Sequence, residues 1–222
     1  TNLDLPLLNF SAPKKKLYPY EKQQYLTDMQ QKFFDKKEAR KYLSELRNSL
    51  TESQRKEKSE KICDRIIASD EFSRCKLLLV YYPIKSEVNI LPLIQKAFEL
   101  GKEIAFPISK KSSYQLDFRK VNSLQELSVG AYGICEPYES APLPALPIKK
   151  EEALCIVPAL ALDKNGGRLG YGKGFYDRFL KNFNGISLGV VFNELLCDYL
   201  PTEPTDIPLD IIITDTGSVT IK

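Results

Sequence analysis

Glycines and basic residues are concentrated in one short segment of the chain, residues 163–177. Four glycines fall between Gly167 and Gly174. Because glycine permits positive φ and close backbone approach, several amide N–H groups can converge there on one anion. Arg168 and Lys173 add full positive charge, and the start of the helix expected after the turn adds a partial one. This combination is typical of a polyphosphate site; the alternative is a tight turn whose glycines solve only a backbone problem.

Two common phosphate-binding motifs do not fit this segment. The spacing from Gly167 fits G-x-x-x-x-G-K, but Gly174 follows where a P-loop has the Ser or Thr that holds Mg²⁺. The beginning of a dinucleotide-binding G-x-G-x-x-G pattern is also present, but Phe175 stands where that pattern requires a small residue. We therefore predict an anion site of another type.

The sequence contains no histidine, which excludes Ser-His-Asp triads, Cys-His dyads and His-ligated zinc. The five cysteines have no C-x-x-C spacing and are odd in number, so we expect reduced, mostly buried thiols. Catalysis must then depend on carboxylates, Lys, Arg, Tyr, backbone amides or a hard metal ion. Asp177, in the first turn of the expected helix, could hold Mg²⁺ or could simply favour the helix dipole.

The elements that position these residues alternate between helices and short apolar strands. The runs 76–82 and 153–162 are nearly continuously apolar, which predicts buried parallel strands. Further strands are expected at 103–108, 114–121, 186–192 and 210–214, and helices at 21–50, 51–69, 90–100 and 175–183. The pattern Thr51-Glu-Ser-Gln54 predicts a capping box, and Asn89 is expected to cap the third helix. This order predicts an α/β fold, a three-layer α/β/α sandwich with a mostly parallel, Rossmann-like open sheet.

Length and charge limit the remaining possibilities. We expect residues 1–30 to form an N-terminal extension and residues 31–222 a single α/β domain. The net charge of +3 is small, which argues against a protein that coats nucleic acid. We find no signal-peptide pattern and no apolar run long enough to span a bilayer. We therefore expect a cytoplasmic monomer without a nucleic-acid or membrane partner.

The glycine-rich segment also carries a family resemblance. The strand expected at 153–162 is followed by Asp163 and by Arg168-Leu-Gly-x-Gly-x-Gly-Phe-Tyr-Asp-Arg178. This ordered series resembles the signature of 5-formyltetrahydrofolate cyclo-ligases, which usually have Tyr where this chain has Phe175. The resemblance covers residues 34–215 and implies a Mg²⁺-requiring, ATP-binding ligase of folate and one-carbon metabolism.

Four further residues match residues of that family. Lys36 and Arg40 match a Lys and an Arg that contact ATP phosphates, and their i,i+4 spacing puts both on one helical face. Glu87 matches a Glu that contacts the pterin part of the folate, although Asn89 replaces the Asp that often follows. Asp206 matches an acidic metal ligand before the last strand. Without the resemblance, each could be an ordinary solvated charge.

The resemblance implies that ATP and 5-formyltetrahydrofolate give 5,10-methenyltetrahydrofolate, ADP and phosphate. The implied ATP-binding residues are Lys36, Arg40, Arg168, Leu169, Gly170, Tyr171, Gly172, Lys173, Gly174, Phe175 and Tyr176. Catalytic roles are implied for Arg168, Lys173 and Tyr176. Folate contacts are implied for Glu87 and Tyr176, and Mg²⁺ coordination for Asp177 and Asp206.

Two other functions are compatible with the residues. One is a nucleotide-binding relative of this family that has lost folate chemistry. The other is a different ATP-dependent ligase or kinase on a Rossmann-like sheet. Because phosphoryl transfer needs positioning and charge neutralisation more than covalent help, none of the three requires histidine.

Overall fold

The computed structural model describes residues 35–145 and 149–221. The chain divides into two units, residues 1–32 and 33–222, and all described residues belong to the second. The extension predicted at 1–30 and the first part of the helix predicted at 21–50 lie outside the described residues. The predicted domain boundary stays a prediction.

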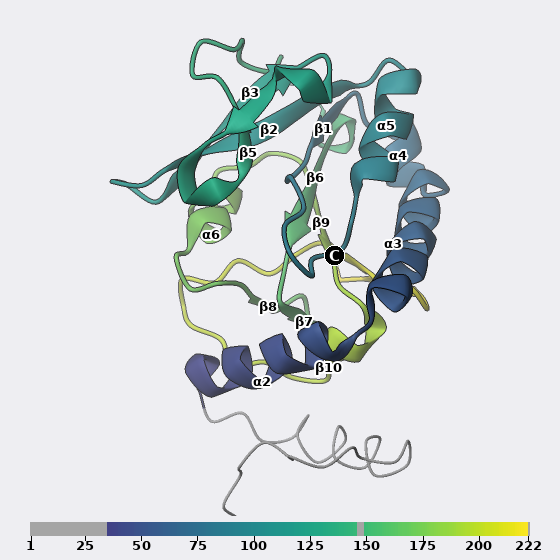
Figure 1. The fold of residues 1–222 in the computed structure, drawn as a ribbon, viewed down its shortest axis with the longest axis vertical. Helices are drawn as coiled ribbons and strands as arrows, with labels where there is room; N and C mark the ends of the chain where they lie inside the picture. Colours follow the sequence, from purple (N-terminus) through teal and green to yellow (C-terminus); the bar gives the residue numbers. More distant parts are fainter. Residues whose placement is uncertain (1–34, 146–148, 222) are drawn as a thin grey trace, which may run out of the picture. The chain divides into compact units, whose positions relative to one another are not determined.

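The second unit is built on a seven-stranded sheet with the order β12-β11-β9-β6-β1-β2-β3 (Figure 1). These strands are β1 Leu77–Leu79, β2 Glu103–Lys110, β3 Gln115–Val121, β6 Ala153–Pro158, β9 Ile186–Val190, β11 Ile211–Ile213 and β12 Ser218–Thr220. The five central strands pair in parallel, and the two edge strands, β3 and β12, pair antiparallel to their neighbours. The predicted mostly parallel sheet is confirmed.

The order of the strands reverses beside β1. From β1 the chain continues to β2 and β3 on one side, and later fills the other side with β6, β9 and β11. In open α/β sheets, ligands bind beyond the carboxyl ends of the strands where the order reverses. The fold therefore directs attention to the segments that follow β1 and β6.

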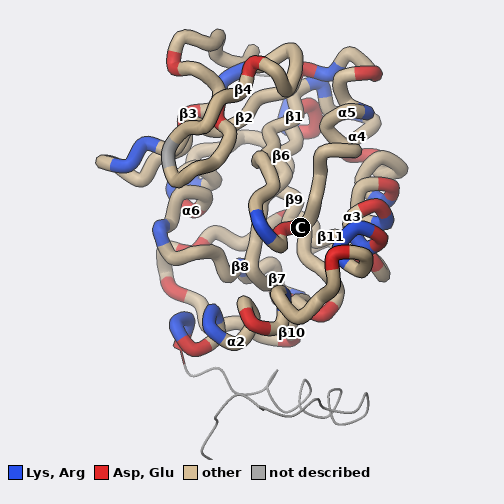
Figure 2. The backbone as a smooth tube through the Cα atoms, viewed as in Figure 1, with Lys and Arg blue, Asp and Glu red and all other residues tan. Residues whose placement is uncertain are grey.

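Helices cover both faces of this sheet, as expected for three layers. The helices of the described residues are α2 Lys36–Ser49, α3 Glu52–Ile67, α4 Asp70–Arg74, α5 Leu91–Glu99 and α6 Phe175–Leu180, of which α2 lies away from this sheet, at the bottom of Figure 1, and contacts the turn at Asn193–Leu195. Figure 1 shows α3, α4 and α5 along one side of the sheet and α6 on the other, where it contacts β3. Basic and acidic residues alternate along α3 (Figure 2).

Local sequence signals explain where the helices begin. The predicted capping box at α3 is confirmed, because Thr51 Oγ1 accepts from the Gln54 N–H and Gln54 Oε1 accepts from the Thr51 N–H. At α5 the N-cap residue is Ile90, but Asn89 Oδ1 accepts a hydrogen bond from the Leu91 N–H at 3.1 Å. The polar side chain predicted for this role therefore satisfies one free amide at the start of α5.

The prediction of a single strand at 153–162 is wrong in one respect, because this segment forms two strands that belong to different sheets. β6 ends at Pro158, and β7 (Ala161–Asp163) pairs with β8 (Arg168–Leu169) and β10 (Leu196–Cys197) in a three-stranded sheet. The chain turns between them, and the Leu160 N–H bonds to the Leu169 carbonyl. An apolar run alone carries no signal for such a turn, since both halves are buried.

Smaller elements complete the described residues. A hairpin of β4 (Leu127–Val129) and β5 (Cys135–Pro137) lies beside β2, and four 3-10 turns are present within the described residues. These turns are η1 Leu124–Glu126, η2 Ala131–Gly133, η3 Lys150–Glu152 and η4 Asn193–Leu195. The helix predicted at 175–183 ends earlier than expected, at Leu180.

The core lies between the helices and the seven-stranded sheet. Its largest fully buried side chains include Phe72, Phe106 and Phe192. All five cysteines are free thiols and only Cys135 is not fully buried, so that prediction is confirmed. Burial raises the pKa of Cys63 to about 11 and of Cys197 to about 12, which keeps both protonated and unreactive. Across residues 35–145 and 149–221, every helix is too short or too polar to cross a membrane.

Candidate active site

The glycine-rich turn joins β8 to α6 and has the backbone conformation that its glycines predict. Gly172 and Gly174 have φ of +89° and +67°, in the left-handed region that side chains disfavour. A Cβ atom on Gly172 would also lie 3.2 Å from the guanidinium carbon of Arg40. Glycine at position 172 therefore favours this backbone conformation and lets the turn lie close to the Arg40 guanidinium.

Two cations of α2 reach this turn and the C-terminal segment. Arg40 Nε donates to the Gly170 carbonyl at 2.8 Å. Lys36 Nζ lies 2.7 Å from an oxygen of Asp206 and 3.3 Å from one of Glu203. The i,i+4 spacing thus directs both side chains toward the same region, as the sequence predicts.

A second cation–carboxylate pair lies at the start of α6. Arg168 Nη2 is 2.7 Å from Asp177 Oδ2, and the Arg168 side chain is only 7% exposed. The Ile207 N–H approaches the other oxygen of Asp177 at 3.5 Å. Asp177 is therefore a neighbour of the segment that carries Asp206, although the two aspartates are far apart in the sequence.

The donor set of these two aspartates fits Mg²⁺. Proteins usually bind Mg²⁺ through one or two carboxylates, with phosphate and water oxygens completing the octahedron. Asp177 and Asp206 supply two carboxylates from adjoining segments. No group of three or more metal-binding side chains occurs among the described residues.

Glu87 lies in the loop after β1 and is held through both carboxylate oxygens. Oε1 accepts from the Tyr171 hydroxyl at 3.0 Å, and Oε2 accepts from the Ile84 N–H at 3.1 Å. Burial raises the pKa of Glu87, and these two hydrogen bonds oppose that rise. Lys85, in the same loop, has φ of +52°. The loop holds a carboxylate in a partly dehydrated position, which is typical of ligand-binding groups.

Tyr176 is a buried hydroxyl without a partner. Among the described residues its OH group makes no hydrogen bond, although almost none of that atom is exposed. Burial, followed by nearby Cys155 and Glu87, raises its pKa well above the ordinary tyrosine value. Its ring lies 5.6 Å from the Arg168 guanidinium carbon. Tyr176 therefore offers a permanent hydrogen-bond donor to whatever occupies the site.

One pocket of about 840 Å³ unites these groups. The predicted site residues that line it are Lys36, Arg40, Glu87, Arg168, Gly170, Tyr171, Gly172, Lys173, Gly174, Phe175, Tyr176, Asp177 and Asp206. Leu169 is the exception, because its side chain is 1% exposed and packs in the core. The pocket lies where β1, β2 and β6 end, at the reversal of strand order.

Sequence reasoning did not identify several other residues of this pocket. They include Tyr81, Tyr82, Tyr132, Cys135, Arg178 and Glu203. Tyr132 packs edge-on against Phe175 at 6.1 Å and Tyr114 does so at 5.7 Å. Both tyrosines have positive φ, and no pattern in the sequence predicts that they would meet at Phe175.

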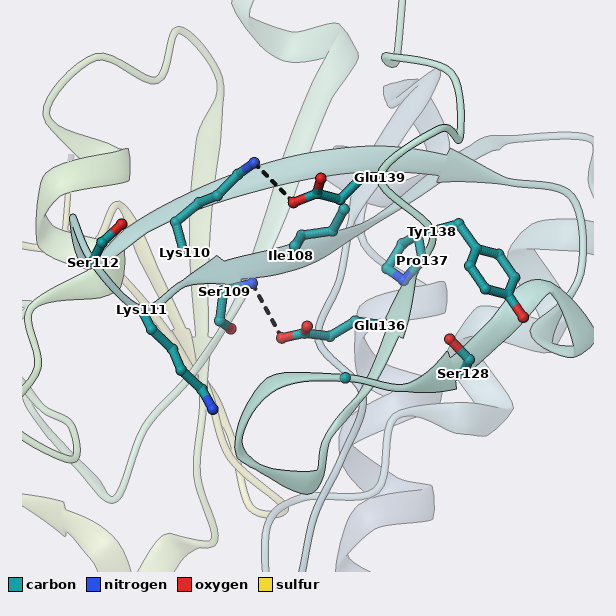
Figure 3. A pocket seen from close by; sticks show the side chains of 11 residues that line it. Ile108, Ser109, Lys110, Lys111, Ser112, Ser128, Glu136, Pro137, Tyr138 and Glu139 are labelled. Carbon is teal, nitrogen blue, oxygen red and sulfur yellow. Dashed lines mark hydrogen bonds and ion pairs between the residues drawn. The ribbon is translucent and has the colours of Figure 1, made fainter.

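A smaller pocket of about 540 Å³ adjoins the first and shares Ser109 and Glu136 with it. Figure 3 shows it between the β2–β3 hairpin and the segment around β5. Glu136 accepts from the Ser109 N–H at 3.1 Å, and Lys110 lies 3.3 Å from Glu139. None of the predicted site residues lines this pocket.

Comparisons with known proteins identify the family of this chain. Residues 33–215 match the model of the 5-formyltetrahydrofolate cyclo-ligase family. A probable 5-formyltetrahydrofolate cyclo-ligase of Caenorhabditis elegans is 29% identical over 80% of this chain and 91% of that protein. The 5-formyltetrahydrofolate cyclo-ligase of Escherichia coli K12 is 30% identical over 76% of this chain and 93% of that protein.

A solved structure is similar as well. The NMR structure of Aquifex aeolicus 5,10-methenyltetrahydrofolate synthetase matches with a TM-score of 0.73 and 34% identity, over 84% of this chain and 93% of that one. Fold and pocket define an α/β enzyme whose site lies at the carboxyl ends of parallel strands. More particularly, the chain belongs to the 5-formyltetrahydrofolate cyclo-ligase family.

Proposed function

We propose that this protein catalyses the ATP- and Mg²⁺-dependent cyclisation of 5-formyltetrahydrofolate to 5,10-methenyltetrahydrofolate, with release of ADP and phosphate. The observation that carries the proposal is the single pocket lined both by the glycine-rich turn with its cations and by Glu87. A phosphate donor and a folate need these two kinds of group within reach of each other, because the phosphate must pass directly between them.

The cations would neutralise the triphosphate. Arg40 already contacts the glycine-rich turn, and Lys173 lines the pocket from the turn itself. Lys36 and Arg168 are paired with Asp206 and Asp177. We propose that Asp177 and Asp206 hold Mg²⁺, which when bound would offset phosphate charge and align the transferred group. Lys36 and Arg168 would then interact with phosphate oxygens.

The chemical problem is the poor leaving group on the formyl carbon. The formyl oxygen attacks the γ-phosphorus and ADP leaves, which gives an imidate phosphate. Nitrogen 10 then attacks the activated carbon and gives up its proton, the ring closes, and the carbon–oxygen bond breaks so that phosphate departs. The unpartnered Tyr176 hydroxyl supports a role in orienting the formyl oxygen, since it is a buried donor that lines the pocket. Glu87 would accept hydrogen bonds from the pterin.

The near-ultraviolet absorbance of the methenyl product tests this function. We expect turnover with ATP, Mg²⁺ and 5-formyltetrahydrofolate together, and none when any one is omitted. Nucleotide binding without product formation would instead indicate a relative without folate chemistry. The expectations of a monomer in the cytoplasm remain predictions, which gel filtration and cell fractionation can check.

A further inference from the structure

Arg47 is a buried cation that the proposed reaction does not use. It lies on α2 two turns after Arg40, and it is 4% exposed. Among the described residues it forms no ion pair, and its Nη1 atom is buried without a hydrogen-bond partner. A buried charge without a carboxylate partner is costly, so its position requires an explanation.

The two hydrogen bonds of Arg47 lead to the folate side of the pocket. Nε donates to Ser86 Oγ at 3.1 Å, and Nη2 donates to the Tyr171 hydroxyl at 2.8 Å. Ser86 in turn gives its proton to Asn48 Oδ1 at 2.7 Å, so it can only accept from the arginine. The guanidinium fork is thereby fixed in one orientation.

Tyr171 transmits that orientation to Glu87. A phenol has a single proton. Because Arg47 donates to the Tyr171 oxygen, that proton is free for Glu87 Oε1, at 3.0 Å. Ile84 holds the other oxygen. Each carboxylate oxygen of Glu87 therefore has one donor, which holds the carboxylate in place.

We propose that Arg47 and Tyr171 are positioning residues for the folate, in which Arg47 orients the Tyr171 hydroxyl and the hydroxyl aligns Glu87 as a charged acceptor. The inference rests on the proposed function. It assigns the Tyr171 side chain to the folate, although the residue lies between two glycines of the turn expected to hold phosphates. Tyr171 as a whole is 57% exposed, but its hydroxyl reaches across the pocket to the loop after β1.

The charges around Glu87 support this role. Burial raises its pKa, whereas the Ile84 amide, the Tyr171 hydroxyl and the Arg47 guanidinium each oppose the rise. The titratable groups that face Glu87 from the neighbouring elements are Arg47 on α2, Tyr81 after β1, Lys85 in its own loop, Tyr171 in the glycine-rich turn and Tyr176 on α6. Only Arg47 and Lys85 are cations. Loss of Tyr171 or Arg47 thus favours the protonated carboxyl.

Tyr171→Phe tests the proposal, because it removes one oxygen from a largely exposed ring and leaves the backbone unchanged. We expect the KM for 5-formyltetrahydrofolate to rise roughly tenfold, as for loss of a hydrogen bond to a charged group. The KM for ATP should change less than about twofold, since no nucleotide contact is lost. The acidic limb of kcat/KM for the folate should move to higher pH. Tyr199→Phe, at another exposed tyrosine, is the matched control.

Arg47→Met is the second variant, of similar length but without charge. It should move the same acidic limb in the same direction, whereas a merely structural arginine would lower thermal stability and leave the limb in place. If Arg47→Met does not fold, Tyr171→Phe still tests the inference.

An increase in the KM for ATP alone in Tyr171→Phe would assign Tyr171 to the nucleotide and overturn the inference. Folate kinetics identical to those of Tyr199→Phe would overturn it as well. Inactive wild-type protein would instead overturn the proposed function and this inference with it.

Discussion

At the scale of single residues, the sequence predicts most of the pocket but not how its members hold one another. Lys36, Arg40 and Glu87 line the pocket as expected. The pairing of Lys36 with Asp206 joins positions that are far apart in the chain, and no local pattern predicts it. The sequence does indicate that Arg47 is buried. It lies four residues after Leu43 and three before Leu50, on the apolar stripe of its helix.

We expect the charged, partly buried Glu87 carboxylate to lower the stability of the folded protein. The direction of its pKa shift shows how this effect changes with pH. A carboxyl whose pKa is raised on folding is stabilising while protonated, and that contribution is lost as pH rises through the raised pKa. Glu87→Gln should therefore stabilise the folded protein, more at pH 8 than at pH 5. Each kcal/mol gained would raise the melting midpoint by about 2–4 °C.

Thermal unfolding at the two pH values measures this effect, with the exposed Glu60→Gln as control. The same Glu87 variant should bind folate poorly, a trade-off between stability and function. A Glu87→Gln protein less stable than wild type at pH 8 would contradict the assigned burial cost.

At the scale of elements, propensity and capping patterns predict that a helix or strand exists better than they predict the residues at which it begins and ends. The capping box located α3, and the apolar runs located β1 and β6, because those signals are local. The division of the 153–162 run depends on where Leu160 finds its backbone partner, which is a long-range matter. The edge strand β12 escaped prediction, since three residues that are mostly exposed carry little pattern.

The Asp163 side chain stabilises the turn between β7 and β8 through hydrogen bonds with the backbone. It is 2% exposed and accepts hydrogen bonds from the backbone N–H groups of Asn165, Gly167 and Leu200. Asp163→Ala should cost about 3 kcal/mol in urea unfolding, because buried donors lose their acceptor. Asp198→Ala, at an exposed carboxylate nearby, should change stability by less than about 0.5 kcal/mol. Equal effects of the two would show that the turn does not depend on Asp163.

At the scale of the whole molecule, strand order explains why the pocket lies where it does. The loops after β1 and β6 separate where the strand order reverses. The glycine-rich turn and the segment 203–207 meet at the same place. Alternating helices and strands predicted the parallel sheet. They could not predict the strand order, because that depends on which crossovers pack together.

Because Lys173 is assigned to ATP and Asp177 to Mg²⁺, their substitution should cause different kinetic defects. Lys173→Ala should mainly raise the KM for ATP, by roughly tenfold to a hundredfold, as one phosphate contact is lost. Asp177→Ala should lower Mg²⁺-dependent turnover by roughly a hundredfold or more and also leave Arg168 without its carboxylate. Steady-state kinetics over a range of Mg²⁺ concentrations separates the two, with the exposed Lys41→Ala as control. Turnover unchanged in both variants would remove these assignments.

The most direct test of the whole account is calorimetric titration of the pure protein with magnesium ATP, in the presence and absence of 5-formyltetrahydrofolate. The account predicts saturable heat at one site in the wild type and much weaker binding in Arg40→Ala, whose guanidinium lies against the glycine-rich turn. Absence of heat from wild-type protein under both conditions would contradict it, and the glycines would then serve only to bend the backbone.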